Sequence, residues 1–174
     1  MLHPPIYDER GRVWCGPTAI AAISGLPVSK IHRMIRRYRN KTRRFYGIAP
    51  YQRKTRPRGM GDIETLAVLD QLGYRPINRF HRHKDGTPYT PGAYLWRKSL
   101  REFCLDRGHY GPFLIQLHNH YVTVSHGMIC DSFTKVPIPW REYPRLKRLV
   151  MNFWQFKPKG KRHDREIGDH DRAE

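Results

Sequence analysis

Cysteine, histidine and aspartate, the residue types of a thiol catalytic site, occur here in that order along the chain. Cys15 stands directly before Gly16-Pro17 and an alanine-rich stretch, where the proline favours a first helical turn. A thiol at the start of a helix feels the positive end of the helix dipole, which lowers its pKa and favours the thiolate. We therefore predict a nucleophile at Cys15. The alternative is the ordinary fate of a free cysteine, a small buried apolar residue.

A β-hairpin is expected in the C-terminal half, where the apolar pattern changes from helical to strand-like. Residues 121–125 and 128–133 have the composition of strands, and His126-Gly127 fits a two-residue turn between them. This turn places Ser125 opposite Met128. The register of all other side chains in the hairpin follows from that pairing.

In this register His120 and Asp131 fall on one face as diagonal neighbours, about 7–8 Å apart in the backbone. The carboxylate can accept a hydrogen bond from one imidazole nitrogen and leave the other for a thiol. We therefore expect this pair to form a site with Cys15, while Cys130 points to the opposite face. The alternative is a solvated hairpin whose polar residues are unrelated.

Zinc is a rival interpretation of the same hairpin. Three further side chains of zinc-ligand type lie in or beside it, namely His118, His126 and Cys130. Their spacing does not select a metal, and the chain contains no Cys-x-x-Cys pair. We therefore expect no metal and no cofactor.

The elements that position these residues are helices followed by strands, which predicts an α+β fold. Helices are expected up to Ser24 and over residues 28–39, 62–72 and 91–105, and strands over 113–117, 121–125, 128–133 and 149–156. Ile31, Met34, Ile35 and Tyr38 form a single apolar stripe at helical spacing. The apolar residues of the third helix are Ile63, Leu66, Leu69 and Leu72. Trp96, Trp140, Trp154, Phe103 and Cys104 are expected in the core.

The length of 174 residues suits one domain. We expect the domain over residues 1–156, with a basic loop over 40–60, and a disordered charged tail over 157–174. The chain has no apolar run that could span a membrane and no apolar stretch of signal-peptide length near its start. Three cysteines are too few for a disulfide scaffold and indicate a reducing compartment.

A strongly basic segment suggests a polyanionic partner. The net charge is +18, and residues 10–61 contain 14 Lys or Arg and no Asp or Glu. Cations bind phosphates, and the interleaved aromatic rings can stack on bases. Nucleic acid bound without sequence preference and an acidic protein are both expected partners, and a solvated charged face is the alternative. The candidate residues are Arg33, Arg36, Arg37, Arg39, Lys41, Arg43, Arg44, Arg53, Lys54, Arg56 and Arg58.

Two motifs together resemble a known family. Cys15-Gly16-Pro17-Thr18-Ala19 opens a helix that ends in Ser24-Gly25-Leu26-Pro27, and His120-Tyr121-Val122-Thr123-Val124 precedes the stretch from His126 to Phe133. These segments, with Met60 to Gly73, are similar to papain-like cysteine peptidases of the C39-like kind, in particular to small versions from phages and bacteria. The resemblance covers about residues 12–135.

The resemblance implies a papain-like fold and a thiol hydrolase that cleaves peptide or amide bonds through a thioester. Cys15 would be the nucleophile, His120 the general base and then acid, and Asp131 the group that orients the imidazole. The family usually has a Gln about six residues before the cysteine, as an oxyanion donor. This chain has Glu9 there, which cannot donate when ionised.

Other oxyanion donors are therefore expected, with the Cys15 backbone N–H as one and Arg10, Arg12 or Trp14 as the second. The substitution of Glu9 for Gln also supports a rival function, a nucleic-acid-binding or virion-structural protein with a vestigial site. We expect a peptide or protein substrate in the first case. A location in the host cytoplasm or in a virion fits both.

Overall fold

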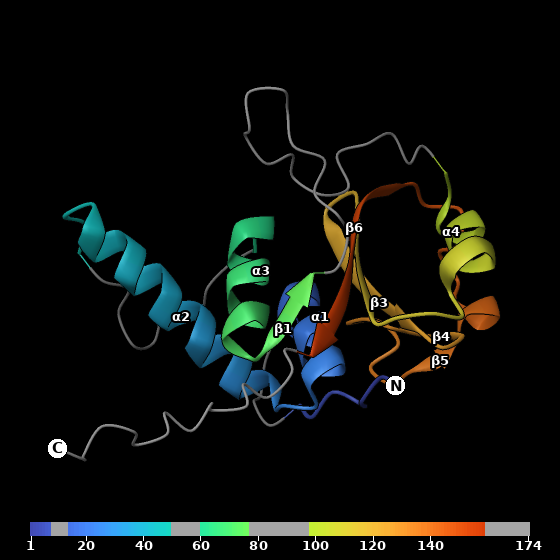
Figure 1. Ribbon diagram of the computed structural model, residues 1–174, viewed down its shortest axis with the longest axis horizontal. Coiled ribbons are helices and arrows are strands. Elements are labelled where there is room, and N and C mark those ends of the chain that lie inside the picture. Colours follow the sequence, from blue (N-terminus) through green and yellow to red (C-terminus); the bar gives the residue numbers. More distant parts are fainter. Residues whose placement is uncertain (8–13, 50–59, 77–97, 159–174) are drawn as a thin grey trace, which may run out of the picture.

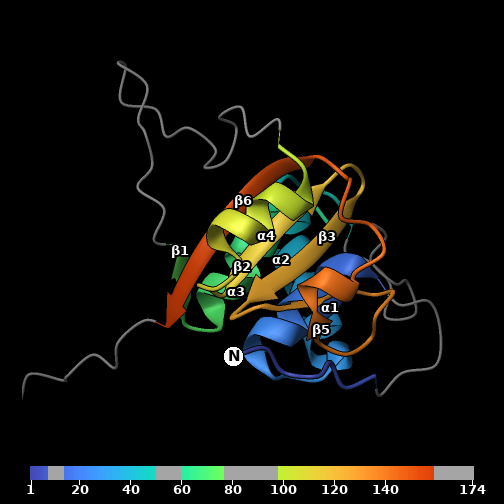
Figure 2. The same cartoon turned by 90° about the vertical axis from the view of Figure 1, so that its right-hand side faces the viewer.

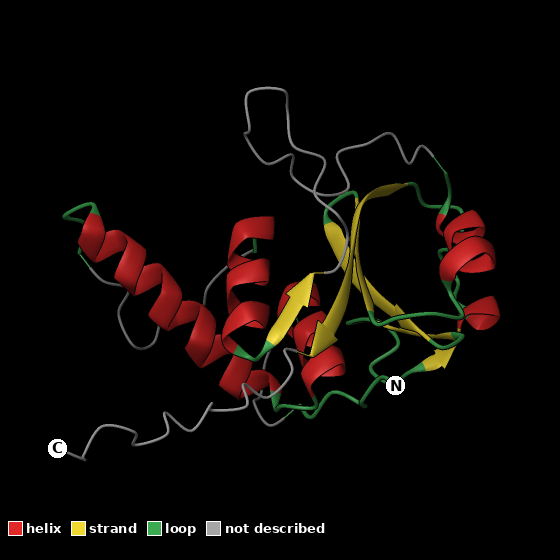
Figure 3. Cartoon of the chain, viewed as in Figure 1, coloured by secondary structure: helices red, strands yellow, loops and turns green. Residues whose placement is uncertain are grey.

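Helices in the N-terminal half precede a mainly C-terminal antiparallel sheet, as the α+β prediction requires (Figures 1 and 3). The computed structural model describes residues 1–7, 14–49, 60–76 and 98–158. The helices are α1 (Cys15–Ser24), α2 (Val28–Phe45), α3 (Asp62–Gln71), α4 (Leu100–Arg107) and the short 3-10 helix η1 (Trp140–Glu142). The strands are β1 (Tyr74–Pro76), β2 (Phe113–Leu117), β3 (His120–Ser125), β4 (Met128–Cys130), β5 (Ile138–Pro139) and β6 (Val150–Pro158).

The strands form one sheet in the order β1-β6-β2-β3-β4-β5, with antiparallel neighbours throughout. Helices α1, α2 and α3 lie on one side of the sheet, and α4 and η1 lie on the other (Figures 1 and 2). Successive side chains of β2 point to opposite sides of the sheet, because Leu114 belongs to the cluster under α1 and Ile115 to the cluster under α4. The sheet therefore separates two apolar cores.

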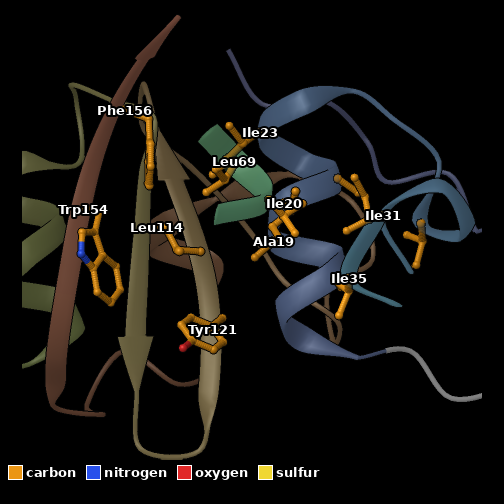
Figure 4. Close-up of a cluster of buried hydrophobic side chains, with 13 residues drawn as sticks. Ala19, Ile20, Ile23, Ile31, Ile35, Leu69, Leu114, Tyr121, Trp154 and Phe156 are labelled. Carbon is orange, nitrogen blue, oxygen red and sulfur yellow. The ribbon is translucent and has the colours of Figure 1, made fainter. Parts of the chain in front are cut away.

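The first core packs α1 against the sheet. Figure 4 shows Ala19 and Ile20 of this helix facing Leu114 and Tyr121 of the strands, and Ile23 beside Leu69 of α3. The helix is buried on almost every side, since all residues from 16 to 23 are buried. A helix that is apolar all round suits a central position, and α1 is held there by α2 and α3 on its outer side.

The start of α1 lies close to the segment at the start of α3. A Cβ atom at Gly16 would lie 2.8 Å from the Met60 sulfur, so this position accommodates only glycine without a shift. The hydroxyl of Tyr121 on β3 donates a hydrogen bond to Asp62, the first residue of α3. These contacts bring the start of α1, the start of α3 and β3 together.

The predicted hairpin register is confirmed. Ser125 pairs with Met128, and the two turn residues have positive φ angles, 51° at His126 and 80° at Gly127. Two positive φ angles are those of a type I′ turn, which matches the twist of the flanking strands. Strand β4 ends at Cys130, however, so the predicted continuation to residue 133 is wrong.

Two predicted helix bounds need correction. Helix α2 continues to Phe45, so residues 40–45 are helical and not part of a loop, because no glycine or proline interrupts them before Gly47. Helix α4 begins at Leu100, after Ser99, whose hydroxyl accepts a hydrogen bond from the Glu102 N–H in a capping box. In α3, the apolar residues differ in burial, since the side chain of Ile63 is 75% exposed and that of Leu69 is buried.

Strand predictions were incomplete at both ends of the sheet. The edge strands β1 and β5 are short and contain proline, and neither was predicted from the sequence. Strand β6 includes Lys157 and Pro158, which the predicted tail contained. Trp140, Trp154, Phe103 and Cys104 are buried as predicted. The first part of the helix expected over residues 91–105, Trp96 and the rest of the tail lie outside the described residues.

Candidate active site

Cys15 is the first residue of α1, and its side chain is partly buried. The first N–H groups of a helix have no partner within the helix, and Pro17 contributes none. Trp14, the residue that precedes the helix, makes no side-chain cap. The backbone N–H groups at the start of α1 are therefore available to the Cys15 sulfur and to whatever binds beside it.

The edge of β3 that faces Cys15 is open because β4 is short. Pairing between these strands ends at Thr123 and Cys130. In an antiparallel ladder alternate N–H groups point to the same edge, so the Tyr121 N–H points the same way as that of Thr123. This N–H donates to the Cys15 sulfur instead of to a strand. The early end of β4 thus creates the place where the thiol sits.

His120 connects the thiol to the carboxylate. Its side chain is 6% exposed, and its Nε2 atom lies 2.7 Å from Oδ2 of Asp131. The imidazole also forms a hydrogen bond with the Cys15 side chain. Because Nε2 is engaged by Asp131, the nitrogen that remains for the thiol is Nδ1. The three side chains therefore interact in the order Cys15, His120 and Asp131, and the hairpin register predicted the pairing of the last two.

Asp131 is fully buried and accepts four hydrogen bonds. The Phe133 and Thr134 N–H groups donate to Oδ1, each at 2.8 Å. The Tyr143 hydroxyl donates to Oδ2 at 2.6 Å, beside the His120 contact. The two backbone contacts form a turn that competes with strand pairing, which explains why β4 ends one residue earlier.

The ionisation of these three groups is coupled. Burial alone would raise the pKa of the Cys15 thiol, but the hydrogen bond and charge of His120 and the N–H groups of Tyr121 and Gly16 hold it below its usual value. Burial alone would lower the pKa of His120, but Asp131 and Cys15 raise it. These directions favour a thiolate beside an imidazolium.

The pKa of Asp131 lies below its usual value, although burial acts in the opposite direction. The hydrogen bonds from His120, Tyr143, Thr134 and Phe133 outweigh the loss of hydration. The same carboxylate raises the pKa of Tyr143, whose burial acts in that direction too. Asp131 is therefore a permanently ionised acceptor near neutral pH.

Two hollows adjoin the site. A narrow one lies beside Cys15 on the α2 side and is lined by Trp14, Cys15, Gly16, Pro17, His32, Ile35 and Met60. The Trp14 Nε1–H is buried and has no hydrogen-bond partner among the described residues. A wider one opens beside His120 and is lined by His118, Asn119, His120, Phe133, Arg145, Arg148, Leu149 and Met151.

The wider hollow is cationic and aromatic. The Phe133 ring packs on the His120 imidazole with a centroid distance of 4.9 Å. The Arg145 guanidinium lies 3.5 Å from the Phe133 ring centroid, and Arg148 is exposed nearby. A group that enters this hollow therefore meets two positive charges next to the imidazole.

Sequence reasoning missed Tyr143 and Arg145, which follow η1. They are 12 and 14 residues beyond Asp131, and no local spacing rule connects them with the hairpin. The sequence shows that Phe133 is aromatic and Arg148 is cationic, but only the fold places these two side chains beside His120. A conserved pattern among relatives would be the signal for such residues, since local periodicity carries none.

The remaining predicted site residues divide into two groups. The α2 cations Arg33, Arg37, Lys41 and Arg44 are exposed, whereas Arg36, Arg39 and Arg43 are partly buried. Glu9, Arg10, Arg12, Arg53, Lys54, Arg56 and Arg58 lie outside the described residues.

The side chains that the alternative interpretation assigned to zinc do not point toward a common position. His118 faces Asn119, His126 faces Ser125, and Cys130 belongs to a separate apolar cluster. Within the described ranges no group of three or more His, Cys, Asp or Glu side chains is arranged to hold a metal ion. The other two thiols, Cys104 and Cys130, have a pKa that burial raises to about 12.

No protein-family model matches this chain, and no curated protein or solved structure is significantly similar to it. The resemblance to papain-like peptidases therefore rests on the motifs quoted above. In the described part of the chain, none of the helices combines the length and apolar character needed to cross a bilayer.

Proposed function

We propose that this chain is a thiol hydrolase with a papain-like arrangement, and that it cleaves peptide or amide bonds. The observation that carries the proposal is the chain of contacts from Cys15 through His120 to the buried, ionised Asp131. A nucleophile, a base within hydrogen-bond reach and a third group that orients the base are the parts of covalent acyl transfer.

The reaction starts with attack of the Cys15 thiolate on the carbonyl carbon of the substrate. The C–N bond breaks, the leaving nitrogen takes the proton from the His120 imidazolium, and a thioester remains on the sulfur. His120 then removes a proton from a water molecule, which attacks the thioester. The products are a carboxylic acid and the regenerated thiol, so no oxidant or cofactor is consumed.

Oxyanion stabilisation needs two donors close to the attacking sulfur. The Cys15 backbone N–H, at the start of α1, is one candidate. Trp14, which lines the hollow beside Cys15, supplies the second candidate, because its buried Nε1–H has no partner among the described residues. An indole can donate where an ionised Glu9 cannot.

Substrate preference follows from the hollow beside His120. Arg145 and Arg148 attract a carboxylate, and Leu149 and Met151 supply apolar surface. We propose that substrates present an acidic side chain here, next to an apolar one.

The experiment that tests the function combines proteolysis with trapping of the intermediate. An unfolded protein such as casein is incubated with the chain, and new peptide ends are identified by mass spectrometry. An activated ester is used in parallel to form an acyl adduct on the enzyme. We expect cleavage and an adduct on Cys15, both lost in Cys15→Ala and retained in Cys104→Ala. Absence of both from the unaltered chain at every pH between 5 and 9 would overturn the proposal.

A further inference from the structure

Helix α2 carries a row of cations on its outer face. Lys30, Arg33, Arg37, Lys41 and Arg44 are all exposed. Their spacings are three, four, four and three residues. At 100° per residue these positions fall within an arc of about 80°, and at 1.5 Å per residue they span about 21 Å. They therefore form one straight stripe, which we call the α2 stripe.

The stripe has no acidic complement on its own helix, because residues 28–45 contain no Asp or Glu. Among the described residues, Glu64 binds Arg39 on a different side of the helix, with contacts of 2.5 and 2.7 Å. Like charges three and four residues apart destabilise a helix. An external polyanion would relieve that repulsion.

Two exposed aromatic rings lie at the end of the stripe. Phe45 is 82% exposed and Tyr46 is 69% exposed, and the two rings meet edge to face with centroids 5.1 Å apart. A shallow groove beside them is lined by Arg37, Tyr38, Lys41, Thr42, Phe45, Tyr46 and Gln71. Large aromatic side chains this exposed gain little from the folded state, and their faces are available to a partner.

We propose that the α2 stripe and the Phe45–Tyr46 pair bind single-stranded nucleic acid. The cations would contact successive phosphates, and the rings would stack on unpaired bases. An acidic peptide would use the charges but has no flat bases for the rings, and the bases of a duplex are already stacked. The distal end of α2 projects away from the sheet in Figure 1, so this surface is separate from the Cys15 site.

The first experiment measures binding of one labelled 20-nucleotide sequence by fluorescence anisotropy, as single-stranded DNA, as RNA and as duplex DNA, across a salt series. If four phosphates are contacted, affinity for the single strand should fall about 50-fold between 50 and 200 mM salt. Comparison of single-stranded DNA with RNA shows whether the sugar affects the affinity. Absence of binding at 50 mM salt, or equal affinity for the duplex, would overturn the proposal.

A matched pair of variants separates the stripe from the overall charge. Replacement of Arg33, Arg37, Lys41 and Arg44 by Gln removes four charges from the stripe. Replacement of Arg101, Lys135, Lys147 and Lys157 by Gln removes four exposed charges elsewhere. We expect the first variant to weaken binding about 50-fold or more at 50 mM salt and the second to weaken it only a few-fold. Equal losses would overturn the assignment to α2.

The aromatic contribution is tested by Phe45→Ala with Tyr46→Ala. Loss of base stacking should weaken single-strand binding by roughly fivefold to a hundredfold and leave duplex binding unchanged. An unchanged single-strand affinity would overturn the role of the rings. Circular dichroism shows whether each variant keeps its helix. Cys15→Ala should bind as the unaltered chain does, so this result and the test of hydrolysis are independent.

Discussion

The Tyr143 hydroxyl donates a hydrogen bond to Oδ2 of Asp131 at 2.6 Å, on the same oxygen that accepts from His120. With the two backbone donors on Oδ1, every strong acceptor site of this buried carboxylate is occupied. The carboxylate is thus held ionised and in one orientation before any substrate binds. The stability of the protein in acid and the orientation of His120 both depend on this arrangement.

Tyr143→Phe should lower the free energy of unfolding by about 1.5–3 kcal/mol, because it removes a hydrogen bond to a charged group without changing the ring. Urea unfolding measures the change. Tyr110→Phe is the matched control, since that side chain is 56% exposed. An equal effect of the two substitutions would show that the Tyr143 hydroxyl contributes nothing particular.

Cys15 should react with iodoacetamide at a lower pH than an ordinary thiol. Its pKa is lowered, whereas the pKa of Cys104 and of Cys130 is raised to about 12, so Cys15 alone should be labelled near pH 7. His120→Ala removes the main group that lowers the pKa of Cys15 and should move its labelling curve to higher pH. Peptide mass spectrometry across a pH series measures each site, and identical curves with and without His120 would contradict the pairing.

Acid should destabilise the protein partly through Asp131. The pKa of the Asp131 carboxyl group is lowered in the folded state, so this group stabilises the fold at pH values above its unfolded pKa of about 3.9. This stabilisation is lost as the pH falls through the folded pKa. Asp131→Asn has no such group. Between pH 4 and pH 2 the unaltered chain should therefore lose more unfolding free energy than this variant, measured by urea unfolding at each pH, and parallel losses would exclude the carboxylate.

Arg145→Gln with Arg148→Gln should reduce kcat/KM for peptides that carry an acidic side chain and spare the matched neutral peptides. Each lost charge contact is expected to lower kcat/KM for the acidic peptide about tenfold, which corresponds to about 1.4 kcal/mol. The ratio of the two kcat/KM values is the measurement. A uniform decrease for both peptides would indicate a structural role for the arginines.

The two faces of α3 should respond differently to truncation. Leu69→Ala removes a fully buried side chain and should cost about 2–5 kcal/mol of unfolding free energy. Ile63→Ala, on the same helix, removes a side chain that is 75% exposed and should cost less than about 0.5 kcal/mol. Denaturant unfolding of both variants tests which side of this helix faces the core.

Local chemistry allowed the sequence to predict the hairpin register and the start of α1. A two-residue turn at His126-Gly127 determines which residues face each other, because strand side chains alternate strictly. Pro17 marks a first helical turn in the same way. These rules act between neighbours in the sequence, so His120, Asp131 and the position of Cys15 could be predicted without the fold.

Other features depend on segments distant in the sequence, and only the tertiary structure decided them. The Tyr121 N–H is free for the Cys15 sulfur because β4 ends at Cys130, and Gly16 leaves room for Met60 at the start of α1. The exposure of Ile63 and the approach of Tyr143 to Asp131 likewise follow from packing. Periodicity shows that a residue can face a core, but the partners across a chain of this length are selected by how the elements pack together.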